Sequence, residues 1–324
     1  MRVLKHLLNT IAAIALVTGI AVHAQSWPSQ PIRIIVPFPP GGTTDQVARL
    51  LQPPLQQALG VSVVVDNRAG ASGAIGAGVA AKALPDGYTF LLVFDTHGVN
   101  PSLIPNLPFD TLKDLSPIML LGKSPMVITA HPSFPYKSLA EVLRLAKAKP
   151  GVVTYGTIGS GSLAHLAMAM ITSHAKIQMT HIPYKGGGPL IINAIGGHVP
   201  VAIASLALFS PHIRSGRLKA IGITSPKRHP QYPDVATVAE QALPGFDAEA
   251  WWGLLAPVNT PAPILTRMHA EVTRALKIPA LQQHLDQQAL TVVASSPDEF
   301  GKFLANEVER WARVVRDNKI NAGE

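Results

Sequence analysis

The strongest constraint on the fold is a regular alternation of short apolar runs with segments of helical periodicity. Ile32 to Val36 is rich in β-branched residues, as expected of a buried strand, and Val61 to Val65 and Thr89 to Val93 repeat the pattern. The segment after the first run carries apolar side chains at helical spacing, and Pro53 and Pro54 are predicted to kink or interrupt that helix. This rhythm predicts parallel sheets covered by helices, the α/β class.

A small-residue helix is predicted over Gly70 to Ala83, and the alternation then restarts near Met126. Ser138 and Glu141 form a capping-box pattern that opens the next helix. The strands predicted after it are 152–155, 178–182, 199–204 and 219–224, and the helices are 164–173, 189–195 and a short one around 211–216. This order predicts one doubly wound domain.

After residue 249 the pattern changes to one strand, Trp251 to Ala256, followed by helices at Ile264 to Leu276 and Ser296 to Val315. The last helix has the clearest start signal, with Ser296 as N-cap and Glu299 closing a capping box. These helices need a sheet to cover, and the first domain is the expected partner. The predicted fold is therefore two-lobed, each lobe a doubly wound, mainly parallel sheet. Lobe 1 is residues 25–125 plus 249–324, lobe 2 is residues 126–248, and the two crossings form a hinge.

The first residues have the pattern of a secretory signal peptide. Arg2 and Lys5 give a positive stretch, and the apolar run from Leu7 to Val22 is about 16 residues, short for a membrane span of roughly 20. It ends in His23 and Ala24, where a small residue suits cleavage. Residues 1–24 are therefore predicted to be a cleaved signal peptide, with a retained membrane anchor as the alternative. The predicted location is the periplasm.

Composition excludes several functions. The 324 residues contain no cysteine, which rules out disulfides, a thiol nucleophile and a thiolate metal site, and suits an oxidising compartment. Net charge is +8, but the basic residues are dispersed and form no stripe with aromatics, so no nucleic-acid partner is expected. A mildly positive field favours anionic ligands, although such a surplus is more often a solvated surface.

A first candidate site follows the first predicted strand and opens the first helix. Ligands of open α/β sheets bind at this end of the strands, and a helix N-terminus presents unpaired N–H groups to an anion. Asp45 either caps the helix from its first turn or accepts a donor group of the ligand. The candidate binding residues here are Phe38, Pro40, Gly41, Gly42, Thr43 and Asp45.

A second candidate repeats this logic after the strand at 152–155. Its hydroxyls and loop N–H groups can donate to a carboxylate, with a plain serine N-cap as the alternative. His165, one turn into the helix, is more often a structural hydrogen bonder than a ligand contact. The candidate residues are Gly159, Ser160, Gly161, Ser162 and His165. Two anion-binding loops, one from each lobe, would clamp an elongated diacid between them.

Three further segments lie at the carboxyl ends of their predicted strands. Tyr184 offers a ring and a hydroxyl, and Gly186 follows it before a helix. The remaining candidates are Asp95, Thr96 and His97 after the third strand of lobe 1, and Ser205 in lobe 2.

Catalytic and cofactor motifs are absent from the sequence. Gly159 to Ser162 is not the G-x-S-x-G nucleophile elbow, because position 158 is Ile. There is no phosphate loop, no dinucleotide fingerprint and no H-E-x-x-H, and the histidines lack metal-ligand spacing. No cofactor and no metal are therefore predicted, and an enzyme is not expected.

Several segments together resemble the Bug family, the periplasmic solute receptors of tripartite tricarboxylate transporters. The matching segments run in order through the chain: 37–45, 67–73, 85–89, 155–157, 159–162 with His165, 183–186, 196–198 and 252–257. The resemblance covers essentially the whole mature chain, and the motifs are specific only in combination.

The resemblance implies a type II periplasmic binding fold that closes like a flytrap on a small carboxylate. The implied ligand is a di- or tricarboxylate, an acidic amino acid or an aromatic acid, held by the loops at 38–45 and 159–162. Implied partners are integral-membrane transporter subunits, and the protein is expected to be a monomer. Asp95 and His97 depart from the small residues expected there, so Asp95 is predicted to disfavour a second carboxylate or to favour an amine or amide. A receptor for a membrane signalling protein and a periplasmic enzyme remain the alternatives.

Overall fold

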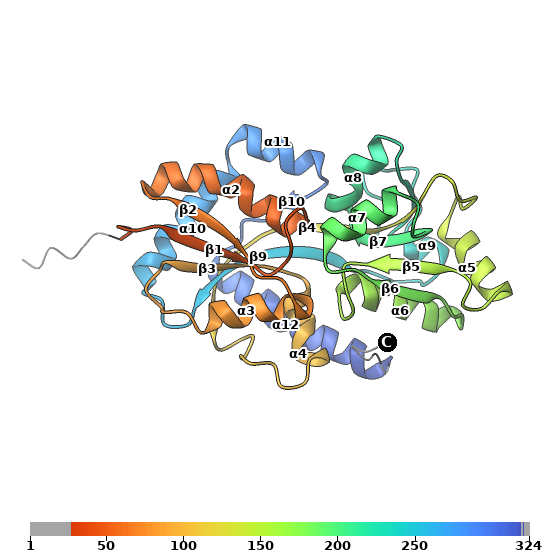
Figure 1. Ribbon diagram of the computed structural model, residues 1–324, viewed down its shortest axis with the longest axis horizontal. Helices are drawn as coiled ribbons and strands as arrows, with labels where there is room; N and C mark the ends of the chain where they lie inside the picture. Colours follow the sequence, from red (N-terminus) through yellow and green to blue (C-terminus); the bar gives the residue numbers. More distant parts are fainter. Residues whose placement is uncertain (1–26, 319, 321–324) are drawn as a thin grey trace, which may run out of the picture.

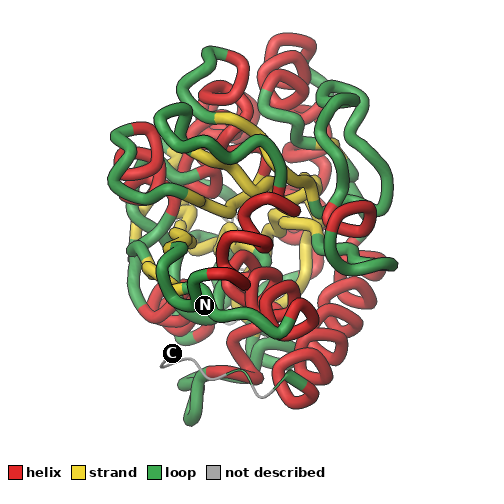
Figure 2. Tube along the Cα trace, turned by 90° about the vertical axis from the view of Figure 1, so that its right-hand side faces the viewer, coloured by secondary structure: helices red, strands yellow, loops and turns green. Residues whose placement is uncertain are grey.

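The computed structural model describes residues 27–318 and residue 320 of the chain. The predicted signal peptide lies outside the described residues. The structure is an α/β fold of two lobes, one drawn in red, orange and blue and the other in green and teal (Figure 1). Seen from the end, the strands lie in the interior and the helices lie around them (Figure 2).

Lobe 1 contains both the first and the last helices and strands of the chain. A parallel unit of three strands is extended by β9, which runs antiparallel to β3. Its elements are β1 (Ile32–Val36), α2 (Thr43–Leu59), β2 (Val63–Asn67), the 3₁₀ turn Ala71–Gly73, α3 (Ala74–Ala81), β3 (Thr89–Phe94), α4 (Thr96–Leu103), β9 (Glu249–Pro257), α10 (Ala262–Leu276), α11 (Pro279–Gln287), β10 (Thr291–Val292) and α12 (Pro297–Asp317). Helix α10 packs on α2, whereas α12 packs on α4 across the sheet (Figure 1).

Lobe 2 repeats the α/β pattern around the parallel strands β6, β5 and β7. Its elements are α5 (Leu139–Ala148), β5 (Thr154–Thr157), α6 (Leu163–Ala175), β6 (Thr180–Pro183), α7 (Gly187–Ile195), β7 (Val201–Ser205), α8 (Leu206–Arg214), β8 (Lys219–Ile223) and α9 (Val238–Gln241).

One long strand, β4 (Leu115–Ala130), joins the two lobes. Its first part pairs with β9 over Leu115 to Pro125, and its second part pairs with β7 and β8 over Met126 to Ala130. The strand order of the combined sheet is therefore β2-β1-β3-β9-β4-β7-β5-β6. Strand β4 therefore changes pairing partners between Pro125 and Met126.

Of the kink or interruption predicted at Pro53 and Pro54, the interruption is wrong. The helix runs from Thr43 to Leu59 with both prolines inside it. Pro53 is exposed, and so is Arg49, whose carbonyl loses its hydrogen-bond donor to the proline. The buried face, which includes Leu51 and Leu55, keeps the helix against the sheet.

Two other local predictions need correction. The helix predicted from Gly70 begins only at Ala74, because Ala71 and Ser72 adopt positive φ in the turn before it. At α5, Ser138 accepts the N–H of Glu141, but the carboxylate of Glu141 accepts from the N–H of Lys137 and not from Ser138. The capping box that begins α12 is confirmed.

Candidate functional site

The loop before α2 is held in shape by the carboxylate of Asp45. This carboxylate accepts hydrogen bonds from the Gly41 N–H (3.0 Å), from Nε of Arg49 (3.0 and 3.1 Å) and from Nδ2 of Asn67 (3.0 Å). Asn67 also donates to the carbonyl of Phe38 at 2.9 Å. Burial alone would raise the pKa of Asp45, but these hydrogen bonds and the charge of Arg49 lower it. Asp45 is thus an ionised anchor of the loop.

The corresponding loop of lobe 2 is held by its own side chains. Ser162 caps α6, accepting the His165 N–H at 3.3 Å and donating to the Gly159 carbonyl at 2.7 Å. Nδ1 of His165 accepts the Gly161 N–H at 3.1 Å. The imidazole of His165 stacks on that of His181 at 4.2 Å. Burial, together with His181, lowers the pKa of His165 to about 4, which keeps the acceptor nitrogen unprotonated at neutral pH.

The two lobes meet through glycines of α7 and the loop before α2. A Cβ added to Gly188 would lie 2.8 Å from the Pro40 carbonyl oxygen, and one added to Gly186 would lie 2.9 Å from Cδ of Pro39. A Cβ added to Gly42 would lie 3.7 Å from the backbone nitrogen of Gly187. Glycine at these positions allows the two backbones to approach across the cleft.

Beside this contact lies a cavity of about 20 Å³ between the lobes. Lobe 1 contributes residues after β1 and Phe94 at the end of β3, and lobe 2 contributes residues at or after the carboxyl ends of β5, β6 and β7. The lining residues are Phe38, Gly42, Thr43, Thr44, Phe94, Ile158, Gly187, Ala204, Ser205 and Leu208.

Three helices begin at this cavity. Thr43 and Thr44 belong to the first turn of α2, Gly187 begins α7, and Ser205 caps α8 by accepting the Leu208 N–H at 3.3 Å. The first N–H groups of a helix have no intrahelical partner and carry the positive end of its dipole. No lining residue has a charged side chain. The cavity therefore offers an anion backbone N–H groups and hydroxyls instead of an ion pair.

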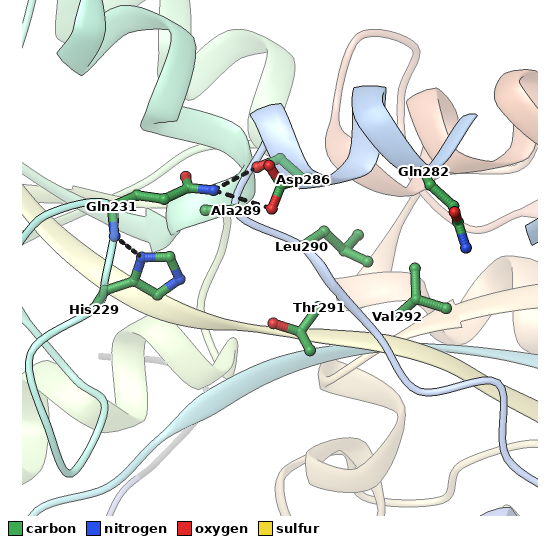
Figure 3. Close-up of a pocket in the computed structure, with 8 residues that line it drawn as sticks. All are labelled: His229, Gln231, Gln282, Asp286, Ala289, Leu290, Thr291 and Val292. Carbon is green, nitrogen blue, oxygen red and sulfur yellow. Dashed lines mark hydrogen bonds between the residues drawn. The ribbon is translucent and has the colours of Figure 1, made fainter. Parts of the chain in front are cut away.

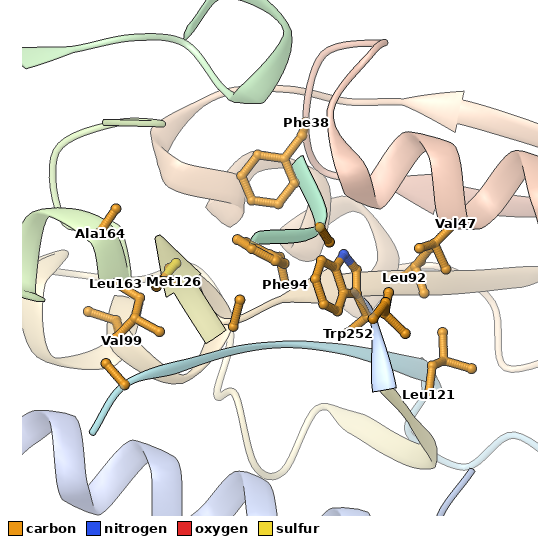
Figure 4. Close-up of a cluster of buried hydrophobic side chains, with 14 of the residues drawn as sticks. Phe38, Val47, Leu92, Phe94, Val99, Leu121, Met126, Leu163, Ala164 and Trp252 are labelled. Carbon is orange, nitrogen blue, oxygen red and sulfur yellow. The ribbon is translucent and has the colours of Figure 1, made fainter. Parts of the chain in front are cut away.

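Aromatic rings form the lobe 1 wall of the cavity. Phe38 meets Phe94 edge to face at 6.0 Å between ring centroids, and Phe94 packs on Trp252 at 5.1 Å. Figure 4 shows these three rings together with Leu163 and Ala164 of α6, which belong to the same buried cluster. The site thus combines a polar end with an apolar wall, as small-molecule sites commonly do.

Asp95 and His97 follow Phe94 but do not line the cavity. Asp95 is fully buried, and the N–H groups of Leu163 and Thr96 face its carboxyl without forming a hydrogen bond of normal geometry. Burial, followed by the charge of Glu307, raises the pKa of Asp95 well above its usual range. Burial likewise lowers the pKa of His97 to about 4. Both side chains therefore favour their uncharged forms.

The structure places the other predicted residues at different distances from the cavity. Of the predicted set, Phe38, Gly42, Thr43 and Ser205 line it directly. Thr96 and His97 border a packed gap on the other side of Phe94. Pro40, Gly41 and Gly186 form the glycine contact, while Ser160 accepts a bond from lobe 1 through its carbonyl. The Tyr184 ring packs over Gly156, outside the cavity lining.

Six lining residues are absent from the individual candidates named from the sequence, although one of them, Thr44, lies within the loop 38–45 that the family resemblance implies. Thr44 and Gly187 adjoin predicted residues, and Phe94 ends a predicted strand, so the strand-end rule could have included them. Ile158, Ala204 and Leu208 are apolar and give no signal of their own. Their part in the site depends on how lobe 2 folds onto lobe 1.

A larger pocket of about 260 Å³ lies on the hinge side, between the loop after β8 and the α11–β10 segment (Figure 3). Three of its polar residues bond to one another: Nε2 of Gln231 donates to the Asp286 carbonyl (2.9 Å) and to its carboxylate (3.2 Å), and the Gln231 N–H donates to His229 at 3.3 Å. No parallel strand ends there, so the interlobe cavity is the better candidate.

Within the described part of the chain, no three histidine, aspartate or glutamate side chains come together as a metal site. Among the same residues, every helix is too short or too polar to cross a bilayer.

Comparisons with a family model and with related proteins point to the same family. The family model described as "Tripartite tricarboxylate transporter family receptor" matches residues 47–320. Protein BugT of Bordetella pertussis is 39% identical over 318 residues, which span 97% of this chain and 98% of BugT. A protein encoded between tcbD and tcbE in Pseudomonas sp. strain P51 is 34% identical over 98% of this chain and 96% of its own length.

Solved structures share the fold along the described chain. The periplasmic binding protein BugD superposes with a TM-score of 0.87 at 31% identity, covering 91% of this chain and 99% of BugD. MatC of Rhodopseudomonas palustris, solved with bound malate, gives a TM-score of 0.84 at 32% identity, covering 89% of this chain and 100% of MatC. The R. palustris protein Rpa4515, solved with adipate, gives 0.87 at 30% identity, covering 91% and 99%.

Proposed function

The chain belongs to the tripartite tricarboxylate transporter receptor family, and from this membership and its cleft we propose that it captures a small carboxylate between its lobes. The observation that carries the proposal is the convergence of three helix N-termini on a cavity without charged side chains. A carboxylate there would accept hydrogen bonds from both lobes at once. The bound malate of MatC and adipate of Rpa4515 are ligands of this chemistry.

The apolar wall favours a ligand with a small carbon body. Phe38, Phe94 and Leu208 would cover that body while the N–H groups hold the carboxylate. The bound solute would then be passed to integral-membrane transporter subunits from the periplasm.

Binding without turnover is the activity that the lining supports. The hydroxyl of Ser205 accepts the Leu208 N–H, and no histidine, aspartate or glutamate is among the residues that line the cavity. A serine there has no general base beside it, which nucleophilic catalysis requires.

The division into lobes is part of this proposal. We place the hinge where β4 and β9 leave the lobe 1 sheet, with residues 25–125 and 249–324 on one side and 126–248 on the other. Rotation there would open the cleft and separate Phe38 and Phe94 from Leu163 and Ala164 of lobe 2, while the lobe 1 cluster around Trp251 and Phe300 stays intact.

A thermal-shift screen tests the function. The purified protein, unfolded and refolded to remove any co-purified solute, would be screened against mono-, di- and tricarboxylates, amino acids and aromatic acids. A ligand at about 100 times its Kd adds about 2.7 kcal/mol, which raises Tm by roughly 5 °C or more. The matched control is the primary amide of each hit. We expect the amide to leave Tm unchanged, and an equal Tm shift with acid and amide would contradict carboxylate binding.

A further inference from the structure

The turn between β2 and α3 has an unusual backbone. Four consecutive residues have positive φ: Gly70 (136°), Ala71 (45°), Ser72 (50°) and Gly73 (93°). Residues with a Cβ disfavour this region, so Ala71 and Ser72 keep it only where their surroundings enforce it. The Gly73 N–H donates to the Gly70 carbonyl at 3.0 Å, and Nδ2 of Asn100 donates to the Ser72 carbonyl at 3.1 Å. The turn is therefore held from inside and from α4.

This backbone aims the Ser72 hydroxyl across the cleft. Its Oγ donates to the Ser160 carbonyl of lobe 2 at 2.6 Å. A Cβ added to Gly159 would lie 3.6 Å from the same Oγ, so the two loops are in close contact here. The bond lies at the lobe 2 loop, whereas the Gly186–Gly188 contact lies at the start of α7.

The acceptor is as fixed as the donor. The Gly159 carbonyl accepts from Ser162, and the Gly161 N–H donates to His165, on either side of Ser160. A Cβ added to Gly161 would lie 3.0 Å from Cδ1 of Leu103. Neither loop can move without breaking its own internal hydrogen bonds.

The bond lies directly beyond the cavity. Phe94 lines the cavity and also packs with Ser72, Gly73, Thr96 and Asn100 among others. The space between these residues is filled, with a free volume of about 0 Å³. Along the floor of lobe 1 the order is therefore helix N-termini, Phe94, and then the Ser72 turn.

We propose that Ser72 is a specificity-determining residue that limits the length of the ligand. This inference rests on the proposed carboxylate binding. The cavity of about 20 Å³ holds about one water molecule, so the lobes must part before any acid can enter. A short carboxylate held at the helix N-termini then ends at Phe94, and the Ser72–Ser160 bond forms again as the lobes close on it. A longer carboxylate must displace the Ser72 hydroxyl from the Ser160 carbonyl. That carbonyl is then left without a hydrogen-bond donor, and an unpaired buried acceptor lowers the binding free energy more than the loss of both partners would.

Isothermal titration with malonate, succinate, glutarate and adipate tests this. In the wild-type protein, affinity falls by about tenfold or more from succinate to adipate, the fold-change expected for one hydrogen bond whose partner stays unsatisfied. Ser72→Ala and Ser72→Gly both remove the hydroxyl, and Gly also relieves the left-handed backbone. In both variants succinate binds more weakly, and the ratio of succinate to adipate affinity shrinks to about threefold or less.

The control is Ala71→Gly, which relaxes the same turn and keeps the hydroxyl, so its ratio stays at the wild-type value. An unchanged ratio in both Ser72 variants, or equal binding of all four acids by the wild type, overturns the length limit alone. Failure of every acid to bind the folded wild-type protein overturns the proposed function itself, and the length limit with it.

Discussion

At the residue scale, the groups that shape the site are mostly buried side chains that do not touch the cavity. Asp45 holds the loop before α2, and His165 and Ser162 hold the loop before α6. These residues leave the N–H groups at the start of α2 and α7 to a ligand, whereas at the start of α8 the N–H groups of Ala207 and Leu208 already donate to Ser124 and Ser205. The chemistry of the site is therefore carried by the backbone, and side chains position it.

Asp45→Asn tests the first of these anchors. The amide cannot accept from three donors as the carboxylate does, so the free energy of unfolding at pH 7 should fall by about 1–3 kcal/mol. The folded pKa is lowered below the usual 3.8, so this stabilisation is complete above pH 3.8 and disappears as pH falls through the folded pKa. Urea unfolding should thus separate variant from wild type at neutral pH and bring them together in acid.

The matched control is Asp234→Asn at an exposed position, which should change stability by less than about 0.5 kcal/mol. A stability difference for Asp45→Asn that stays constant down to about pH 3 would show that the carboxylate charge plays no part.

His165 predicts a pH dependence of stability in a higher pH range than Asp45, because its pKa of about 4 lies below the usual 6.5. Between these values the unfolded chain binds more protons than the folded one, so stability falls as pH is lowered from 6.5 to 4. His165→Asn keeps an acceptor where Nδ1 stands and cannot titrate, so its unfolding free energy should fall less over this range, by about 1–3 kcal/mol. Buried His97 keeps its own contribution in both proteins.

Urea unfolding at pH 7 and pH 5 measures how steeply the unfolding free energy falls with pH. His165→Gln, whose acceptor is placed as Nε2 would be, serves as the control and should lose stability at both pH values. Equal slopes for the wild type and His165→Asn would show that His165 does not carry the pH dependence.

Much of the residue-level site was predictable. Phe38, Gly42, Thr43 and Ser205 follow from the rule that ligands meet the carboxyl ends of strands. The part of Asp45 in anchoring its loop could be suspected from its position, but its contact with Asn67 depends on the pairing of β1 with β2. Ile158 and Leu208 could not be found, since nothing local distinguishes them from other buried apolar residues.

At the element scale, the site depends on short helices that start at glycine or serine. Helix α7 has Gly187 and Gly188 in its first turn, where alanine would normally stabilise a helix. Glycine is needed at position 188 because Pro40 of the other lobe lies against it. This requirement exists only while the lobes are closed.

Gly188→Ala should therefore separate affinity from stability. Its Cβ would lie 2.8 Å from the Pro40 carbonyl oxygen, so carboxylate affinity by isothermal titration should fall about tenfold or more. The Tm of the unliganded protein should stay the same or rise, because the open form has no clash and alanine favours the helix. Gly301→Ala in α12 is the control and should leave affinity unchanged. Unchanged affinity in Gly188→Ala would contradict the closed arrangement.

The order of elements was largely readable from the sequence, whereas several boundaries and small elements were not. Strong local signals, such as the capping box of α12, gave correct starts. Helix α11 and strand β10 were missed, because Pro279 to Val292 carries no strong apolar period and β10 is fixed only by pairing with β4. Helix α2 continues through two prolines because its buried face outweighs the lost bonds.

At the scale of the whole molecule, the polar contacts between the lobes include some on the cleft side and some on the hinge side. The cleft side has the Gly186–Gly188 contact and the Ser72–Ser160 bond. The hinge side has the Ser210 hydroxyl donating to the Gln287 carbonyl at 3.2 Å and Gln231 donating to Asp286. Domains joined by two crossings move relative to each other by default, so a ligand that favours the cleft-side contacts would shift the molecule toward closure.

Small-angle X-ray scattering with and without the carboxylate identified by thermal shift measures whether the lobes close on the ligand. We expect the radius of gyration to fall at saturating carboxylate, to stay unchanged with the matching amide, and to fall less in Gly188→Ala. A radius of gyration that does not change at saturating carboxylate would contradict capture by closure of the two lobes.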